Sequence, residues 1–246
     1  MNITETPCDE KLKITKCVRF DCDDADESIP FPLPRVLNFA WALIGGAGSG
    51  KSTLLANLFC KEGRSPYWKK FDTVHVWSPS LASMSKQVFT IPEEQIFNAL
   101  DVDEIEGVVE SLDPTERNLL VFDDVVAEMR EATMTTLLAR LLFNRRHLGL
   151  AIIMTSQVWN RIPLVLRRTF TQISLFKTAR KEVDNIVEEH IQIDKKDFEK
   201  VLRFSYRAKN DFLHIDTTMP PHDCFFRNFN KLTLKDPRDE ELIDPE

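Results

Sequence analysis

Residues 45–53 of this chain read Gly-Gly-Ala-Gly-Ser-Gly-Lys-Ser-Thr, and this stretch decides the fold. The whole chain has seven glycines, and four of them fall between residues 45 and 50. Glycine adopts positive φ angles and lets a ligand approach the backbone closely, so the cluster indicates a specialised loop. The spacing Gly45-x4-Gly50-Lys51-Ser52 is that of a loop that binds the phosphates of a nucleotide.

The residues on either side of the loop fit this interpretation. Residues 39–44 form an apolar run that predicts a buried strand entering the loop, and residues 52–60 predict a helix whose amino-terminal dipole faces the phosphates. We expect Lys51 to reach the β- and γ-phosphates of ATP and the Ser52 hydroxyl to bind Mg²⁺. The predicted nucleotide-binding residues are Gly45, Gly46, Ala47, Gly48, Ser49, Gly50, Lys51, Ser52 and Thr53.

The composition is that of one globular domain. With 246 residues, of which 43 % are hydrophobic and 29 % charged, the chain is long enough to bury a full core. No apolar run approaches the ~18–20 residues needed to cross a membrane, and the amino terminus is polar, unlike a signal peptide. Because no apolar run is long enough, we expect no membrane partner. Five cysteines without a CxxC pair favour free thiols in a reducing compartment.

The net charge of −7 is unevenly distributed along the chain. Residues 93–131 carry thirteen acidic and two basic side chains, whereas residues 140–181 carry nine basic and no acidic ones. The basic block can be the solvated surface of neighbouring elements, or a surface that binds the phosphates of a nucleotide or a nucleic acid. The positions of its arginines in the fold must separate these two interpretations.

Predicted strands and helices alternate through the rest of the sequence. Continuous apolar strands that alternate with amphipathic helices favour a parallel sheet covered on both faces. The predicted fold class is therefore α/β, with a mostly parallel sheet flanked by helices. Further strands are expected at 71–77, 118–123, 151–155, 171–177 and 212–215, and further helices at 102–112, 134–142, 179–190 and 196–205.

Three segments are expected along the chain. Residues 1–35 are predicted to form a small amino-terminal β annex, with an edge strand at 11–20 followed by an extended connector that carries three prolines. Residues 36–235 are predicted to form the P-loop ATPase domain, and residues 236–246 a mobile tail.

Two adjacent carboxylates follow the predicted strand at 118–123. Residues 119–122 are apolar, and Asp123 and Asp124 come directly after them, about 70 residues beyond the loop. The carboxyl ends of parallel strands are where α/β sheets place their binding sites. We assign Asp123 to the hydrated Mg²⁺ beside Ser52 and Asp124 to the attacking water, although the reverse assignment also fits the spacing.

Residues 146–157 carry an arginine, a glycine three residues later, an apolar strand and a final glutamine. This spacing resembles the FtsK/HerA superfamily of DNA-pumping ring ATPases, and the chain is more similar still to the genome-packaging ATPases of large nucleocytoplasmic DNA viruses and virophages. The resemblance covers residues 38–180. It rests on the phosphate loop, the Asp-Asp pair, residues 146–157, and Pro163-x3-Arg167 leading into residues 171–176. The Asp-Asp pair matches the viral branch rather than the Asp-Glu of FtsK and HerA, whereas Thr169 stands where the viral pattern has Asn.

The resemblance implies a P-loop NTPase fold of the RecA/ASCE type and assigns roles to several residues. Gln157 would sense the γ-phosphate, with the linking of strand ends as its alternative role. Arg146 would be the arginine finger of a neighbouring subunit, with a surface ion pair as its alternative, and Arg167 is the second candidate finger. Together with Lys51 and Asp124, these are the expected catalytic residues.

The implied function is an ATP-hydrolysing translocase that packages double-stranded viral DNA into a capsid, whatever the DNA sequence. The resemblance also implies a homo-oligomeric ring, contact with capsid or portal-vertex proteins, and location in the host cytoplasm at the viral factory or with the virion. Two alternatives from other classes stay open: a P-loop kinase for a small molecule, and a scaffold that binds nucleotide without turnover. ATP hydrolysis measured with and without double-stranded DNA separates the three.

Overall fold

The computed structural model describes residues 24–59, 64–79, 91–125 and 128–234 of the chain. The edge strand expected at 11–20 and the tail expected at 236–246 lie outside these residues. In the part of the chain that is described, no helix is both long and apolar enough to cross a membrane.

The centre of the molecule is a nine-stranded sheet with the order β3-β2-β4-β5-β1-β6-β7-β8-β9. The strands from β3 to β6 in this order run parallel to one another, and β7, β8 and β9 follow as an antiparallel meander. The bounds are β1 Ala40–Ile44, β2 Thr73–Trp77, β3 Ile96–Phe97, β4 Asn118–Asp123, β5 Leu150–Ser156, β6 Gln172–Phe176, β7 Phe212–Asp216, β8 Phe225–Arg227 and β9 Asn230–Lys231.

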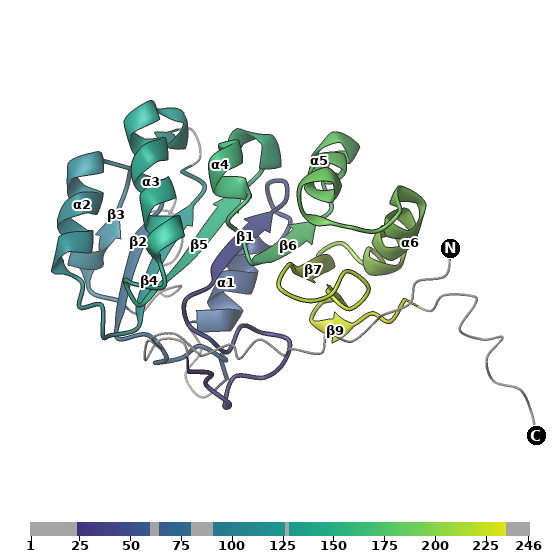
Figure 1. Cartoon of the computed structure of the whole chain (residues 1–246), viewed down its shortest axis with the longest axis horizontal. Coiled ribbons are helices and arrows are strands. Elements are labelled where there is room, and N and C mark those ends of the chain that lie inside the picture. The colour runs from purple at the N-terminus through teal and green to yellow at the C-terminus, as the bar shows by residue number, and fades with distance from the viewer. Residues whose placement is uncertain (1–23, 60–63, 80–90, 126–127, 235–246) are drawn as a thin grey trace, which may run out of the picture.

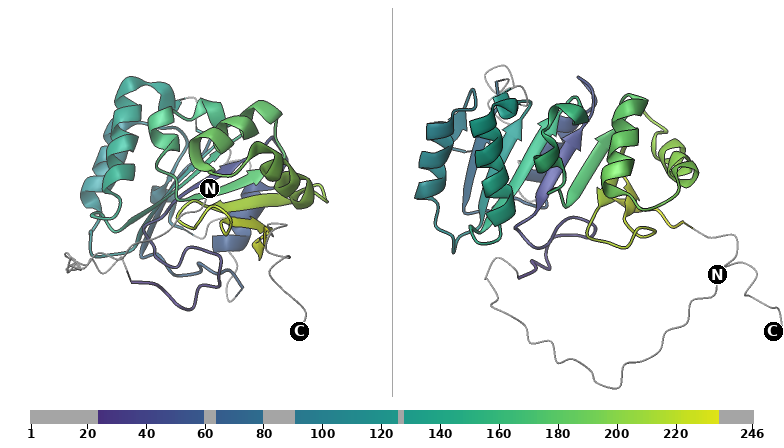
Figure 2. Two further views of the ribbon diagram at one scale, coloured as in Figure 1. Left: turned by 45° about the vertical axis from the view of Figure 1, so that its right-hand side comes forward. Right: turned by 45° about the horizontal axis from the view of Figure 1, so that its top comes forward.

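Helices cover both faces of the sheet, which confirms the predicted α/β class. Helix α1 packs on one face, and α2 to α6 cover the other (Figure 1, Figure 2). Short 3₁₀ turns precede β3, α3 and α4. The bounds are α1 Lys51–Phe59, α2 Val102–Ser111, α3 Ala132–Asn144, α4 Leu164–Arg167, α5 Arg180–His190 and α6 Lys195–Ser205.

The alternation of side chains along β1 shows how one sheet supports two cores. Ala40, Ala42 and Ile44 face the core under α2 to α6, whereas Trp41 and Leu43 face the core under α1. Successive strand residues point to opposite faces, so a strand buried on both sides reads as one continuous apolar run. This is why the central strands could be predicted from such runs.

The elements that the sequence left unpredicted are short. Strands β3, β8 and β9 have two or three residues each, and α4 has four. Elements of this length carry too few residues for a periodic pattern to emerge. The longer strands and helices lie within two residues of the expected bounds, and the apolar stripe expected along the helix at 134–142 is buried core.

Residues 24–37 lie against the face that carries α1, and the expected extended connector is wrong. The N–H of Ile29 donates to the carbonyl of Asp26 at 3.1 Å, and the N–H of Leu33 donates to that of Pro30 at 3.0 Å, which closes two turns. The side chains of Ile29 and Leu33 are buried in the core under α1. The segment turns because it buries two apolar side chains, which a straight connector would leave in solvent.

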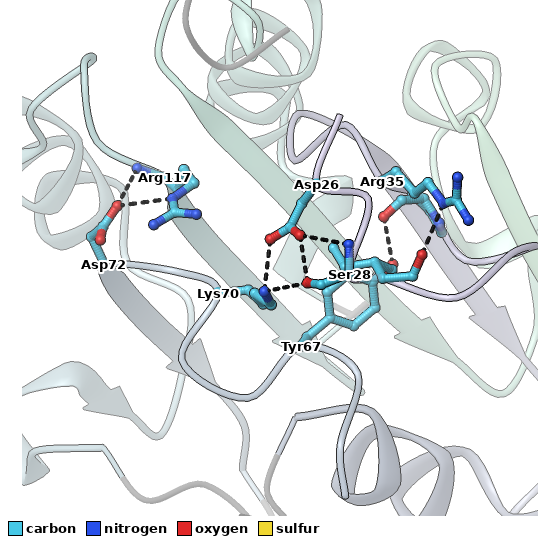
Figure 3. Close-up of polar contacts among 9 residues, drawn as sticks. Asp26, Ser28, Arg35, Tyr67, Lys70, Asp72 and Arg117 are labelled. Atoms are coloured by element: carbon cyan, nitrogen blue, oxygen red, sulfur yellow. Dashed lines mark hydrogen bonds and ion pairs between the residues drawn. The ribbon is translucent and has the colours of Figure 1, made fainter. Parts of the chain in front are cut away.

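Lys70 holds this segment to the loop before β2. Its ammonium lies 2.8 Å from Oδ2 of Asp26 and donates to Oγ of Ser28 at 2.6 Å (Figure 3). The hydrogen bonds from Lys70 and then Ser28 hold the pKa of the Asp26 carboxyl down to about 2. The Tyr67 hydroxyl donates to the carbonyl of Pro34 at 2.9 Å. The described part of the expected annex is therefore attached to the P-loop domain, and the boundary at residue 35 stays a prediction.

A tight turn at residues 145–149 leads into β5. Gly149 has φ +54°, and a Cβ added to it would overlap the carbonyl oxygen of Glu116 and lie 2.7 Å from that of Pro114. The Gly149 carbonyl accepts the N–H of Asn118 at 2.8 Å, so this turn starts the pairing of β4 with β5. The position needs glycine for both its dihedral angle and its lack of a side chain.

We predict that Gly149→Ala lowers the free energy of unfolding by about 2 kcal/mol or more, because it adds both a left-handed strain and a backbone clash. The matched control is Gly107→Ala in α2, where a Cβ meets nothing within 4 Å. That control should raise stability by about 0.5–1 kcal/mol, because alanine favours a helix over glycine. Urea denaturation measures both, and equal stability of the two variants would contradict the role of this turn.

Candidate nucleotide site

The glycine-rich loop joins β1 to α1 at the carboxyl end of the sheet. Gly48 has φ +69° and Gly50 has φ +112°, dihedral angles that a residue with a side chain rarely adopts. The N–H of Gly45 donates to the carbonyl of Ser156 at 3.1 Å, which fixes the start of the loop against the end of β5. The predicted strand–loop–helix arrangement is therefore present from residue 40 to residue 59, and Cys60, the last residue of the expected helix, lies outside the described residues.

The loop packs closely on β6. A Cβ at Gly45 would lie 2.5 Å from Cβ of Phe176 and 2.7 Å from Oγ of Ser49. The Ser49 Oγ is buried and has no hydrogen-bond partner among the described residues. Buried polar atoms are nearly always satisfied, so an unpaired hydroxyl within a phosphate-loop sequence fits a site that is completed by a ligand.

Lys51 begins α1 and points back over the loop. Its side chain is buried, and its Nζ donates to the carbonyls of Gly45 at 2.6 Å and Gly46 at 3.2 Å. Burial lowers the pKa of the ammonium, and the nearby carboxylates of Asp124 and Asp123 partly oppose that shift. The predicted lysine and the predicted acidic pair thus share one electrostatic environment.

Asp123 is the last residue of β4 and is held by hydroxyls from both neighbouring strands. Ser78, directly after β2, donates to Oδ2 at 3.0 Å, and Thr155 in β5 donates to Oδ1 at 2.6 Å. The carboxylate is buried, so these two bonds offset much of the cost of removing its charge from water. Each oxygen keeps a lone pair for a further ligand.

Asp124 lies beyond the strand, exposed, in a left-handed conformation with φ +57°. Its N–H donates to Oγ1 of Thr155 at 3.1 Å, and its Oδ2 accepts Nε2 of Gln157 at 2.7 Å. Strained dihedral angles in non-glycine residues cluster at functional sites, where the surroundings hold them in place. Asp124 and Gln157, which were predicted separately as site residues, are brought together at the same end of the sheet as the loop.

Strand β5 lies between β1 and β4 and brings these residues into line. Ile44 at the end of β1 is paired with Ser156, and Asp123 at the end of β4 is paired with Thr155. The strand that leads into Gln157 is therefore a direct neighbour of the strand that ends in Asp123. The arrangement leaves one strand width between the phosphate loop and the carboxylates, which is filled by residues 155–157.

Arg146 lies at the opposite end of the sheet. It is exposed in the turn before β5, and β5 has seven residues. At about 3.3 Å per residue, the turn is about 20 Å from the phosphate loop of its own chain. Arg146 therefore does not join the cluster formed by Lys51, Asp123, Asp124 and Gln157.

Arg167 ends α4 inside the molecule. Its guanidinium forms an ion pair with Glu189 at 2.8 Å, donates to Oδ1 of Asn160 at 2.9 Å and lies 5.7 Å from the ring centre of Trp159. Only 11 % of its side chain is exposed. These contacts give Arg167 a role in joining α4 to α5.

The basic residues of the block at 140–181 fall into two groups in the structure. Arg140 and Arg180 form ion pairs with Glu106 and Glu199, and Arg145 donates to backbone carbonyls. These residues, with Arg167, take part in joining elements of the fold. Other basic residues of the block are exposed on several different elements: Arg146, Arg161, Arg168, Lys177 and Lys181.

Two residues of the site were missed by sequence reasoning, Ser78 and Thr155. Each is a small hydroxyl residue at the carboxyl end of a strand that flanks β4. A polar residue that ends an apolar strand is the available signal, but the sequence does not show which strands are neighbours. Their role depends on the strand order, which only the structure gives.

The residues present fit a bound Mg²⁺ with oxygen ligands. Among the described residues, no group of three or more His, Cys, Asp and Glu side chains could hold a metal ion by themselves. Mg²⁺ usually keeps several waters and binds through one or two protein oxygens together with the phosphates of a substrate. The Ser52 hydroxyl at the start of α1 and the Asp123 carboxylate at the end of β4 are the two protein oxygens that would hold the ion.

We predict that Thr155→Val lowers the free energy of unfolding by about 1–3 kcal/mol. The valine keeps the shape of the side chain but leaves Oδ1 of Asp123 and the N–H of Asp124 without the hydroxyl. Thr155→Ser retains the hydroxyl and is the matched control, with a smaller loss. Chemical denaturation distinguishes them, and equal losses would show that the hydroxyl holds neither residue.

Comparison with known proteins supports a viral relationship. The family model described as "Poxvirus A32 protein" matches residues 35–218. The DNA packaging protein OPG160 of vaccinia virus (strain Copenhagen) is 24 % identical over 157 residues, which cover 61 % of this chain and 57 % of that protein. OPG160 of monkeypox virus is also 24 % identical over 157 residues and is covered to 51 %. The chain thus matches little more than half the length of these relatives.

Two solved structures share the fold. The DNA-packaging ATPase B204 from Sulfolobus turreted icosahedral virus has a TM-score of 0.53 and 17 % identity, covering 74 % of this chain and 93 % of that one. The cytoplasmic domain of the Thermomonospora curvata type VII secretion ATPase EccC has a TM-score of 0.55 and 13 % identity, covering 83 % of this chain and 25 % of that one. The family model spans well over half of the sequence and confirms the viral genome-packaging resemblance: the chain belongs to the Poxvirus A32 protein family.

Proposed function

We propose that this chain is an ATP-hydrolysing motor that moves double-stranded DNA during packaging of a viral genome. The observation that carries the proposal is the alignment of three strand ends, which gathers Lys51, Asp123, Asp124 and Gln157 beside one glycine-rich loop. The name of the poxvirus relatives, DNA packaging protein, supports the choice of DNA as the partner. Structures of the genome packaging NTPase B204 from Sulfolobus turreted icosahedral virus 2, a further match to this fold, contain AMPPCP or ATP-gammaS, which supports a nucleoside triphosphate as the ligand.

The proposed chemistry divides the site between two carboxylates. Ser52 and Asp123 would hold Mg²⁺, which neutralises phosphate charge when bound. Asp124, exposed and hydrogen-bonded to Gln157, would orient the attacking water, and Gln157 would sense the γ-phosphate. Lys51 would exchange the carbonyls of Gly45 and Gly46 for phosphate oxygens and offset the charge that develops as the bond breaks.

The proposed contact with DNA is electrostatic. Packaging moves every segment of a genome, so phosphates rather than base edges are the suitable handle. A homo-oligomeric ring would collect basic residues of several subunits around one duplex, which reconciles DNA binding with a subunit charge of −7. We also propose that the protein works at a viral factory in the host cytoplasm or together with the virion. There it would contact capsid or portal-vertex proteins.

The two other functions explain less of the site. A P-loop kinase would use the glycine-rich loop but would leave Asp124 and the Gln157 strand without their roles. A scaffold without turnover would not require the water-orienting pair of an exposed carboxylate and an amide. The motor therefore accounts for more of the observed contacts.

We predict that the purified chain hydrolyses ATP and that double-stranded DNA increases the rate. Lys51→Ala should remove hydrolysis with and without DNA while the fold is kept. Lys200→Ala is the matched control, since Lys200 is exposed on α6 and pairs only locally with Asp197. Phosphate release measures the rate. Hydrolysis by the Lys51→Ala protein would show that the loop is not part of the active site. A hydrolysis rate that DNA does not change would exclude the DNA motor.

We also predict that Arg146 acts on the site of a neighbouring subunit. Its distance from its own loop and its exposure favour it over Arg167, whose guanidinium is paired inside the chain. Arg146→Ala should bind ATP normally and hydrolyse it about 10³–10⁵-fold more slowly, as expected for a finger supplied in trans.

A mixing experiment tests this assignment. Arg146→Ala subunits mixed with Lys51→Ala subunits should regain hydrolysis, because each mixture contains interfaces with one intact loop and one intact finger. The control is Arg203→Ala, because Arg203 is an exposed arginine on α6. This variant should hydrolyse ATP at the wild-type rate without being mixed. Arg167→Ala is run alongside. If no mixture recovers activity, the shared site is wrong.

A further inference from the structure

A loop far away in the sequence borders the phosphate loop on the side away from the carboxylates. A Cβ at Gly50 would lie 3.4 Å from Cε1 of Phe176, 3.7 Å from Cβ of Asn210 and 3.8 Å from Cγ of Asn210. Asn210 belongs to the connection between α6 and β7, residues 206–211. This connection is therefore part of the wall around the nucleotide site.

The connection is held firmly although most of it is exposed. The buried carboxylate of Asp211 accepts the N–H groups of Arg207 at 2.9 Å and Ala208 at 2.8 Å. It also accepts Nη2 of Arg227 at 2.8 Å and Nδ2 of Asn228 at 2.6 Å. The bonds from Arg227 and Asn228 hold the pKa of Asp211 well below its usual value. A loop with such an anchor is pre-organised.

The other end of the connection is fixed to the strand that touches the phosphate loop. The Tyr206 hydroxyl donates to the carbonyl of Leu175 at 3.0 Å, and Phe176 follows in β6. Phe212, the first residue of β7, is paired with Phe176. The distance between Asn210 and Gly50 is thus set by the sheet itself.

The order of strands determines which end of a nucleotide lies here. The residues proposed to act on the γ-phosphate end β4 and β5, on one side of β1. Strands β6 and β7 lie on the other side of β1 (Figure 1). A nucleoside triphosphate that lies across the loop with its γ-phosphate toward Asp124 directs its nucleoside toward Asn210.

We propose that residues 206–211 form the nucleoside-binding side of the site, and that the Asn210 amide contacts the nucleoside and helps to select it. An amide both donates and accepts hydrogen bonds, so it suits the mixed polar groups of a base or a ribose, whereas phosphates need only donors. The exposed stretch 207–210 offers this side chain to a ligand from a rigid support. The inference rests on the proposed nucleotide site.

The test compares a ligand that has a nucleoside with one that lacks it. We expect Asn210→Ala to weaken binding of ATP about tenfold, the loss of one or two good hydrogen bonds, and to leave binding of inorganic tripolyphosphate unchanged. Asn144→Ala is the matched control, an exposed asparagine at the end of α3 on the opposite edge of the sheet. Calorimetry measures both affinities, and thermal unfolding checks that each variant is folded.

The outcomes separate this inference from the proposed function. Unchanged ATP affinity in Asn210→Ala, or an equal loss for ATP and tripolyphosphate, overturns the nucleoside assignment while the nucleotide site stands. A wild-type chain that binds neither ligand overturns both. A loss confined to ATP, absent in Asn144→Ala, supports the assignment.

Discussion

The alignment of β5 between β1 and β4 is the constraint on which the rest of this structure depends. The phosphate loop and the acidic pair are separated by about 70 residues in sequence, and the strands that carry them, β1 and β4, are not neighbours in the sheet. Strand β5 joins them, because its Thr155 hydroxyl bonds Asp123 while the carbonyl of Ser156 accepts the N–H of Gly45. A slip of one residue in β5 would turn Thr155 to the other face of the sheet and break the cluster.

The register that aligns this end of the sheet is set at the other end. Asn118 at the start of β4 is buried, and its amide donates to the carbonyls of Glu116 and Leu148 at 3.2 Å each. Its backbone N–H is bonded to Gly149 in the turn before β5. Parallel strands have no hairpin to fix their offset, so a specific polar contact is needed to choose one pairing. Residues about 20 Å from the proposed chemistry thus determine whether its side chains meet.

The sequence predicted those parts of the fold and site that depend on local pattern. The glycine-rich loop, the long buried strands and the Asp123-Asp124 pair each stand out within a few residues. What could not be predicted depends on neighbours in space. Ser78 and Thr155 contact Asp123 only because β2 and β5 flank β4. Residues 24–37 form turns because the side chains of Ile29 and Leu33 pack into the core under α1. Asn210 carries no motif, and its place beside Gly50 follows from the antiparallel pairing of β7 with β6.

The two arginines suggested by the family pattern differ in their burial and in their position relative to the phosphate loop. Arg167 is only 11 % exposed and forms an ion pair with Glu189, so freeing it for a neighbour would leave that partly buried carboxylate without its cation. Arg146 is exposed at the end of the sheet opposite the loop, about 20 Å from the phosphate loop of its own chain. A charge that serves catalysis from this position needs a second copy of the chain, placed so that the amino edge of one sheet meets the carboxyl edge of the next. Such head-to-tail contacts close into rings when the rotation between copies allows it, so the position of one exposed arginine connects the proposed chemistry to the proposed assembly.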